Sequence, residues 1–162
     1  GYDAYPDEIR RIIERLGLGD HVRLLGYQPD ALRFYPAFDL YVHAPVFERG
    51  CTEAFGHSIV EAMAHRLPVI TSAIGGPAEV VKPGVTGDLI EPGNHDQLAR
   101  LIITLLSDPR LRRARGTEGY QRYRAFFTQE REEREYEALY AELLGRPDLS
   151  PSGELVRSEC IQ

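Results

Sequence analysis

The sequence predicts an α/β fold built on a buried parallel sheet, and three observations carry this prediction. Phe55, Ile59, Ala62 and Met63 recur at the spacing of a helix that packs against a core. The segment 67–71 follows directly and is short and almost wholly apolar, as in the buried strands of parallel sheets. Similar short strand-like segments alternate with amphipathic helical segments along the rest of the chain, which favours βα units.

The first part of the chain begins with an amphipathic helix. Residues 6–16 place four apolar side chains on one face, and Pro6 and Gly17 stand where prolines and glycines usually mark the two ends of a helix. The elements expected next are, in order, a strand over residues 22–26, a short helix over residues 29–38 and a strand over residues 39–45. Leu32, Tyr35 and Phe38 are the expected core residues of the short helix.

The second part continues the alternation. Gly75 and Gly76 form a turn before a short helix, and the last strand covers residues 88–93. Asn94 or Asp96 is expected to cap the next helix, which carries an apolar face. A helix over residues 110–115 and an amphipathic helix over residues 129–144 follow; the apolar face of the latter consists of Tyr136, Leu139, Tyr140 and Leu143.

The start of the central helix carries residues whose spacing suits a sugar nucleotide. A helix N-terminus presents unpaired backbone N–H groups and the positive end of the helix dipole, which favours a diphosphate. Gly56 stands at this start and lets a ligand approach the backbone closely. Glu61 lies roughly 8 Å further along the axis and can accept hydrogen bonds from both hydroxyls of a ribose. Glu53, before Gly56, is the candidate for contact with the donor sugar.

These residues closely resemble the signature of the retaining family-4, or group 1, glycosyltransferases. The motif E-x-F-G-x-x-x-x-E-A-M-A begins at Glu53, and L-P-V-I-T-S and G-G-x-x-E follow at Leu67 and Gly75. In the family they lie in the C-terminal, donor-binding half of a GT-B fold, and the resemblance covers residues 1–124. It implies a Rossmann-like, doubly wound parallel sheet with helices on both faces.

The resemblance implies transfer of a sugar from a nucleotide-sugar donor to an acceptor hydroxyl, with retention at the anomeric carbon. Glu53 would be the catalytic carboxylate that orients the donor sugar, and Glu61 would hold the ribose. Family members need no catalytic metal, so we expect no metal and no cofactor besides the donor substrate. The acceptor stays open between a glycan, a lipid and a small molecule. The expected donor-binding residues are Gly26, Tyr27, Phe55, Gly56, His57, Ser58, Glu61, Gly75 and Gly76.

Some of these assignments have an alternative. Tyr27 can stack on a nucleobase or pack against its neighbours in a turn. Gly75 and Gly76 can admit a ligand or simply make a tight connection. His57, when protonated, can help to neutralise the phosphates. Together with His43 and His65 it invites a metal hypothesis, but His57 and His65 are about 12 Å apart along a helix, too far to share one ion.

By resemblance, the chain is N-terminally truncated: it lacks the acceptor half and the first part of the donor half, with the family's basic pair. Residues 1–145 are therefore expected to form a partial donor-binding domain that is inactive alone, and residues 146–162 a disordered tail. A strand left without its neighbour predicts poor stability or self-association. Two alternatives stay open: another GT-B enzyme such as an epimerase, and a non-catalytic domain that binds nucleotide or a partner.

Composition excludes several function classes. A net charge of -6 without a basic block argues against a nucleic-acid surface. No apolar run approaches the ~20 residues of a membrane helix, and no signal peptide is recognised, so a cytoplasmic setting is expected, with peripheral membrane association of the full-length protein left open. Cys51 and Cys160 form no close-spaced pair, which disfavours a disulfide framework or a zinc site.

Two positions depart from the family's pattern. Arg66 stands where the family usually has glycine at the end of the central helix. A left-handed backbone there should cost arginine about 1 kcal/mol relative to glycine. The alternative is that the helix ends differently. The loop before Glu53 is longer than usual and contains Glu48, Arg49, Gly50 and Cys51, whose role stays open.

Overall fold

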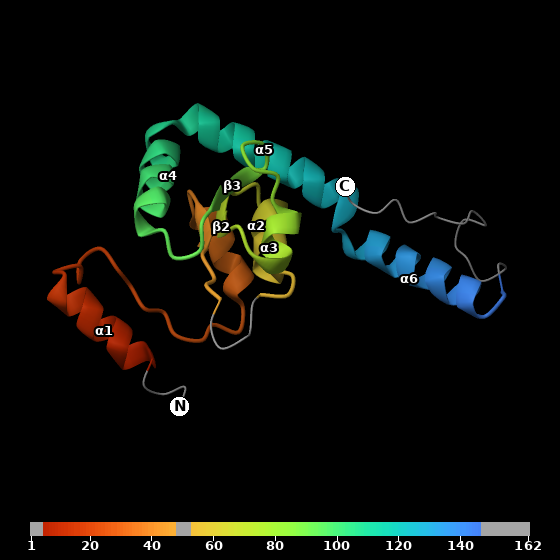
Figure 1. The fold of residues 1–162 in the computed structure, drawn as a ribbon, viewed down its shortest axis with the longest axis horizontal. Coiled ribbons are helices and arrows are strands. Elements are labelled where there is room, and N and C mark those ends of the chain that lie inside the picture. Colours follow the sequence, from red (N-terminus) through yellow and green to blue (C-terminus); the bar gives the residue numbers. More distant parts are fainter. Residues whose placement is uncertain (1–4, 48–52, 147–162) are drawn as a thin grey trace. The chain divides into compact units, whose positions relative to one another are not determined.

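The computed structural model describes residues 5–47 and 53–146 of the chain (Figure 1). The chain divides into two compact units, residues 1–33 and residues 34–162, which are described separately below. The loop residues Glu48 to Cys51, the second cysteine Cys160 and the tail from residue 147 onward lie outside the described residues.

The first unit contains the expected amphipathic helix, α1 (Tyr5–Arg15). Its acidic first turn and basic last turn match the helix dipole, and Gly17 follows it in a left-handed conformation with φ of 65°. The prediction of a strand over residues 22–26 is wrong, because this segment has neither strand nor helix structure. A β-strand exists only through its hydrogen bonds to a neighbour, and no described strand pairs with this segment.

A 3₁₀ helix, η2 (Ala31–Ala37), crosses the boundary between the two units. It lies within the expected short helix over residues 29–38. Pro36 stands inside it and has no backbone N–H to donate, which disfavours a regular α-helix at this point. Tyr35 is the buried residue of this element.

The second unit is built on a parallel sheet of three described strands in the order β1-β2-β3. The strands are β1 (Tyr41–His43), β2 (Val69–Ser72) and β3 (Gly87–Ile90). Val69 is opposite Tyr41 on one side and Gly87 on the other. Every residue of β2 is buried, as predicted for this segment.

The described part of the second unit contains five α-helices, which follow the sheet strands or one another along the chain. They are α2 (His57–Ala64), α3 (Gly75–Val80), α4 (His95–Ser107), α5 (Pro109–Phe126) and α6 (Gln129–Leu143). Asn94 caps α4, as predicted, because its side chain accepts a hydrogen bond from the Gln97 N–H at 2.9 Å. Asp108 caps α5 in the same way through the N–H groups of Arg110 and Leu111.

Helix α5 extends well beyond the expected residues 110–115, so the predicted end of this helix is wrong. Packing explains the greater length of α5. Gly116 lies in its middle and allows α5 to pack directly on the chain that leaves α2. A Cβ atom at Gly116 would overlap the carbonyl oxygen of Arg66 and lie 2.8 Å from its carbon. The glycine that weakens the helical pattern in the sequence is therefore the residue that lets the helix pack.

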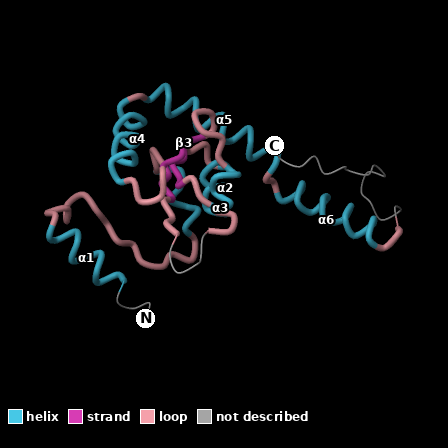
Figure 2. Tube along the Cα trace, in the orientation of Figure 1, coloured by secondary structure: helices cyan, strands magenta, loops and turns pink. Residues whose placement is uncertain are grey.

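Helices cover both faces of the sheet, as expected for a doubly wound fold (Figure 2). Successive residues of a strand point to opposite faces, so Val69 joins one core cluster and Ile70 the other. The first cluster contains Ile59 and Met63 of α2, and the second contains Leu105 of α4.

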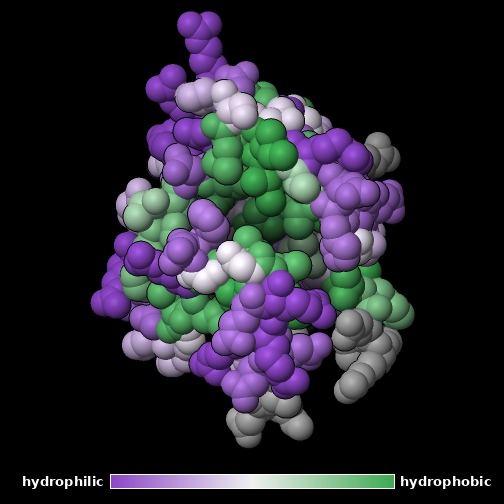
Figure 3. All heavy atoms as spheres, turned by 90° about the vertical axis from the view of Figure 1, so that its left-hand side faces the viewer, coloured by the Kyte–Doolittle hydropathy of each residue, from purple (hydrophilic) through white to green (hydrophobic). Residues whose placement is uncertain are grey.

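Many apolar side chains remain at the surface among charged ones (Figure 3). Within the described residues, β1 pairs with β2 alone, so one edge of β1 is unpaired. The apolar face of α6, including Tyr136, Tyr140 and Leu143, is also exposed. The predicted weak stability or self-association stays a prediction that these surfaces favour. Among the described helices, none has both the length and the apolar character needed to cross a bilayer.

Candidate functional site

The start of α2 is organised by Gly56 and Glu53. Gly56 precedes the helix with φ of 87°, a left-handed conformation that glycine adopts at least cost. Its N–H donates to Oε1 of Glu53 at 3.2 Å, so the carboxylate lies against the residue that begins the helix. The next two N–H groups, those of His57 and Ser58, have no acceptor among the described residues. Two unpaired donors and the positive helix end therefore meet beside Glu53.

The second oxygen of Glu53 faces the end of β1. Its Oε2 lies 3.7 Å from Nε2 of His43, the last residue of that strand. His43 is opposite Thr71 of β2, so both side chains point to the face of the sheet that α2 covers. His43 Nε2 and Thr71 Oγ1 are buried and have no hydrogen-bond partner within the described chain. Polar groups thus converge below the helix start.

Gly76 holds the beginning of α3 against the Glu53 segment. Its N–H donates to the carbonyl oxygen of Glu53 at 3.3 Å. A Cβ atom at Gly76 would overlap Ala54 O and Phe55 Cα and would lie 2.7 Å from the carbonyl carbon of Ala54. The backbone approach that glycine permits is therefore made here by the protein's own chain, which gives Gly76 a packing role. Ligand contact by Gly75 and Gly76 stays a prediction.

Glu61 lies one turn further along α2 and is held by a residue that the sequence analysis assigned only to the core. The hydroxyl of Tyr35 donates to Oε2 of Glu61 at 3.1 Å, with Ser58 O a more distant acceptor at 3.4 Å. Burial, reinforced by Tyr41 and Glu61, raises the pKa of Tyr35. No periodicity identifies this contact, because the partners are 26 residues apart in different elements.

An aromatic side chain just after α5 and a basic side chain within α5 support the same region. Phe55 contacts the ring of His57, with centroids 5.1 Å apart, and packs edge-on against Phe127 at 5.9 Å. Arg122 of α5 is buried and donates to Val80 O at 2.7 Å and to the carbonyl oxygen of Glu79. It therefore satisfies the carboxyl end of α3, while burial lowers the pKa of its guanidinium.

Arg66 confirms the predicted departure at the end of α2. Its φ of 58° makes it the one non-glycine residue with a left-handed backbone in the described parts of the chain. Its guanidinium lies over the ring of Tyr120, 3.8 Å from the centroid. This stacking offsets part of the backbone cost that glycine would avoid.

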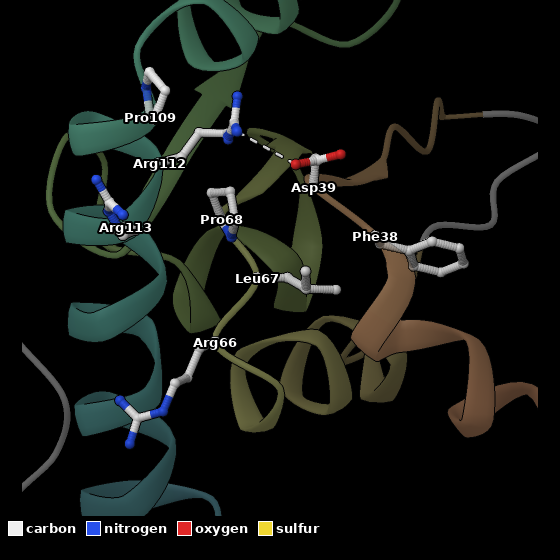
Figure 4. A pocket seen from close by; sticks show the side chains of 8 residues that line it. All are labelled: Phe38, Asp39, Arg66, Leu67, Pro68, Pro109, Arg112 and Arg113. Atoms are coloured by element: carbon white, nitrogen blue, oxygen red, sulfur yellow. Dashed lines mark ion pairs between the residues drawn. The ribbon is translucent and has the colours of Figure 1, made fainter.

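A cavity lies at the opposite end of the sheet from Glu53. It measures about 280 Å³ and is entered beside Asp39 and Pro68, which precede β1 and β2 (Figure 4). Asp39 and Arg112 in this cavity are already paired with each other, 3.3 Å apart. Arg112 also donates to Leu106 O at 2.7 Å. This cavity is not the predicted donor site, which lies at the carboxyl ends of the strands, where ligands of open α/β sheets bind.

Two of the expected donor-binding residues lie in the first unit. Gly26 has φ of 63°, and Tyr27 is 90% exposed. Their proposed contact with a base stays a prediction. No group of three His, Cys, Asp or Glu side chains in residues 5–47 and 53–146 is arranged to hold a metal ion.

Comparison with known proteins places this geometry in a family. The family model for glycosyl transferases group 1 matches residues 1–122. The chain is 35% identical over 142 residues to a lipopolysaccharide core biosynthesis mannosyltransferase of Rhizobium leguminosarum bv. viciae. That match covers 88% of this chain but 39% of the relative, so the chain spans less than half of the curated relative's length.

Solved structures agree. HepE of Anabaena, crystallised in complex with UDP, is 31% identical and superposes with a TM-score of 0.78 over 88% of this chain and 37% of HepE. The C-terminal domain of a glycosyl transferase group 1 family protein of Francisella tularensis is 26% identical, with a TM-score of 0.67 over 77% of this chain and 63% of that one. The GT-B-type α/β fold expected from the sequence is confirmed. The chain belongs to the glycosyl transferases group 1 family.

Proposed function

We propose that this chain is the nucleotide-sugar-binding part of a retaining glycosyltransferase that transfers a sugar to an acceptor hydroxyl. The observation that carries the proposal is the start of α2, where unpaired N–H groups of His57 and Ser58 lie between two carboxylates, Glu53 and Glu61. The UDP and UDP-glucose complexes of HepE support a nucleotide-sugar ligand. Retention of configuration follows from the family resemblance.

In this proposal the diphosphate lies at the start of α2. The N–H groups of His57 and Ser58 and the positive helix end stabilise the charge that grows on the leaving diphosphate during transfer. A protonated His57 adds to that field. The donors are fixed by the helix before the substrate arrives, so little reorganisation is needed in the transition state.

The two carboxylates have different tasks. Glu53 orients the donor sugar, because its Oε1 is tied to the Gly56 N–H and Oε2 faces His43. Glu61 accepts hydrogen bonds from the ribose hydroxyls. In this proposal Glu53 holds the donor sugar and Glu61 holds the ribose, on either side of the diphosphate.

The test is a titration of the purified chain with UDP, GDP and ADP, followed by saturation-transfer NMR. We expect selective binding of one nucleotide and loss of most of it in Glu61→Ala. Glu118→Ala is the matched control, since it removes the same charge from an exposed position of α5. A folded chain that binds none of the three nucleotides, or a Glu61→Ala variant that binds like wild type, would contradict the proposal. Binding without sugar transfer is expected of this chain alone.

A further inference from the structure

We infer that Tyr35 is a positioning residue for Glu61: its hydroxyl holds one carboxylate oxygen and leaves the other to the ribose of the donor. The inference rests on the proposed function, in which Glu61 binds that ribose. It assigns a role to a residue outside the signature stretch, because Tyr35 belongs to η2, which precedes β1 in the sequence.

The position of the Tyr35 hydroxyl is set by the packing of its ring. The ring stacks on Tyr41, with centroids 5.7 Å apart, and on His65, with centroids 5.1 Å apart. The side chain is 5% exposed. A ring clamped in this way directs its hydroxyl to one place, and Oε2 of Glu61 lies 3.1 Å from it. The donor therefore has a fixed direction before any ligand binds.

The acceptor keeps its capacity for further hydrogen bonds. Within the described residues, no arginine, lysine or histidine side chain pairs with the Glu61 carboxylate. An ionised carboxylate offers about four acceptor positions, and the hydroxyl of Tyr35 uses one of them. Vicinal hydroxyls can take others, because Glu61 is partly exposed. A cation at Oε2 would instead have neutralised the charge that makes Glu61 a strong acceptor.

The hydroxyl contributes to the site rather than to the packing of the ring. Phenylalanine would make the same ring contacts with Tyr41 and His65. A buried hydroxyl without a partner is unfavourable, and the acceptors of this one are Glu61 and the Ser58 carbonyl. Holding Glu61 in one rotamer lowers the entropy that a ligand would otherwise lose by ordering the side chain. The expected consequence is a stronger preference for a nucleotide with both ribose hydroxyls.

The experiment measures this preference. The Kd values of UDP, GDP and ADP and of their 2′-deoxy counterparts are determined by calorimetry for the chain, and the ratio of deoxy to ribo Kd is taken for the tightest base. Wild type should show a ratio of about ten, the effect of a hydrogen bond to a charged group. Tyr35→Phe should lower the ratio to about three or less, and Glu61→Ala to about one.

A matched variant separates positioning from stability. Tyr123 packs against the same core cluster, and its hydroxyl has no hydrogen bond to the described residues, so Tyr123→Phe should leave the ratio unchanged. If Tyr35→Phe weakens the ribo and deoxy nucleotides equally, the hydroxyl is structural and the inference is overturned, while the donor site stands. If wild type does not prefer the ribo form, or Glu61→Ala keeps the preference, the ribose role of Glu61 fails and the inference fails with it.

A second replacement covers the case in which Tyr35→Phe does not fold. Placing 4-aminophenylalanine at position 35 keeps the ring and supplies an N–H donor at the same place. A weaker donor should give a ratio between those of wild type and Glu61→Ala. A ratio equal to that of Glu61→Ala, despite the N–H donor, would show that a donor at this position does not orient the carboxylate, and would overturn the inference.

Discussion

Replacing Gly76 by alanine should displace the segment that carries Glu53. A Cβ atom at this position would overlap Ala54 O and Phe55 Cα and lie 2.7 Å from Ala54 C, where ordinary contacts begin at 3.4 Å. The two backbones must therefore separate by at least about 0.7 Å, the difference of those two distances. The bond from the Gly76 N–H to Glu53 O, already 3.3 Å long, would be lost.

The magnitude follows from overpacking and from that lost bond. Overpacking a close-packed contact costs about 1–3 kcal/mol, so we expect about 2 kcal/mol and a Tm lower by about 4–8 °C. A shift of this size moves the Glu53 carboxylate and the start of α2. The nucleotide affinity should fall about tenfold, equivalent to about 1.4 kcal/mol.

The assay pairs thermal unfolding with nucleotide titration and uses Gly116→Ala as the control. Gly116 is equally crowded, since its Cβ would overlap Arg66 O, but it lies between α5 and the far end of α2. This variant should lose stability, partly offset by the helix propensity of alanine, and keep its nucleotide affinity. Equal loss of affinity in both variants would show that general destabilisation, not displacement of Glu53, weakens binding. A Gly76→Ala variant that matches wild type in both measurements would refute the close approach itself.

Three further predictions concern the residues that support the site. Arg122→Met should cost about 3 kcal/mol, because two hydrogen bonds to the end of α3 are lost. Replacement of the exposed Arg124 by Met should leave the stability nearly unchanged, and urea unfolding measures both variants. Arg66→Gly should be more stable than Arg66→Ala by about 1 kcal/mol in the same assay, because only glycine avoids left-handed strain, and equal stabilities would contradict this. Burial raises the pKa of the Tyr35 hydroxyl in the folded state, so this hydroxyl stays protonated at pH values at which it ionises in the unfolded state. The stability of the wild type should therefore fall as the pH rises above about 10. Tyr35→Phe should reduce the slope of stability against pH.

The sequence predicts those parts of the fold that depend on local chemistry. The helix at 57–64, the buried strand at 69–72 and the Asn94 cap each follow from residues within one or two turns of one another. The left-handed backbone at Arg66 is one of the two helix endings that the sequence left open, since a helix end has a restricted set of conformations. The signature residues Glu53, Gly56 and Glu61 fall in one continuous stretch, so their order about the helix start could be predicted too.

The errors and omissions concern long-range contacts. Residues 22–26 have the composition of a strand, but a strand also needs a neighbour, and the described chain supplies none. The length of α5 depends on the packing of Gly116 against Arg66, which are 50 residues apart in the sequence. Tyr35 was recognised as core and its hydrogen bond to Glu61 was not. Hydrophobic periodicity shows that a side chain is buried, but not which polar atom it meets.

The candidate site therefore combines a local motif with distant supports. The groups that are predicted to face the ligand lie between residues 53 and 61, and they are supported by Gly76 of α3, by Tyr35 of η2 and, through the end of α3, by Arg122 of α5. A substitution at any of these supports leaves the signature intact and moves the groups that the signature names. Since a misplacement of about 1 Å can cost about 100-fold in catalysis, a sequence that keeps the motif but loses a support should bind its nucleotide poorly. Conversely, the motif can tolerate change outside its ligand-facing atoms as long as these three contacts hold.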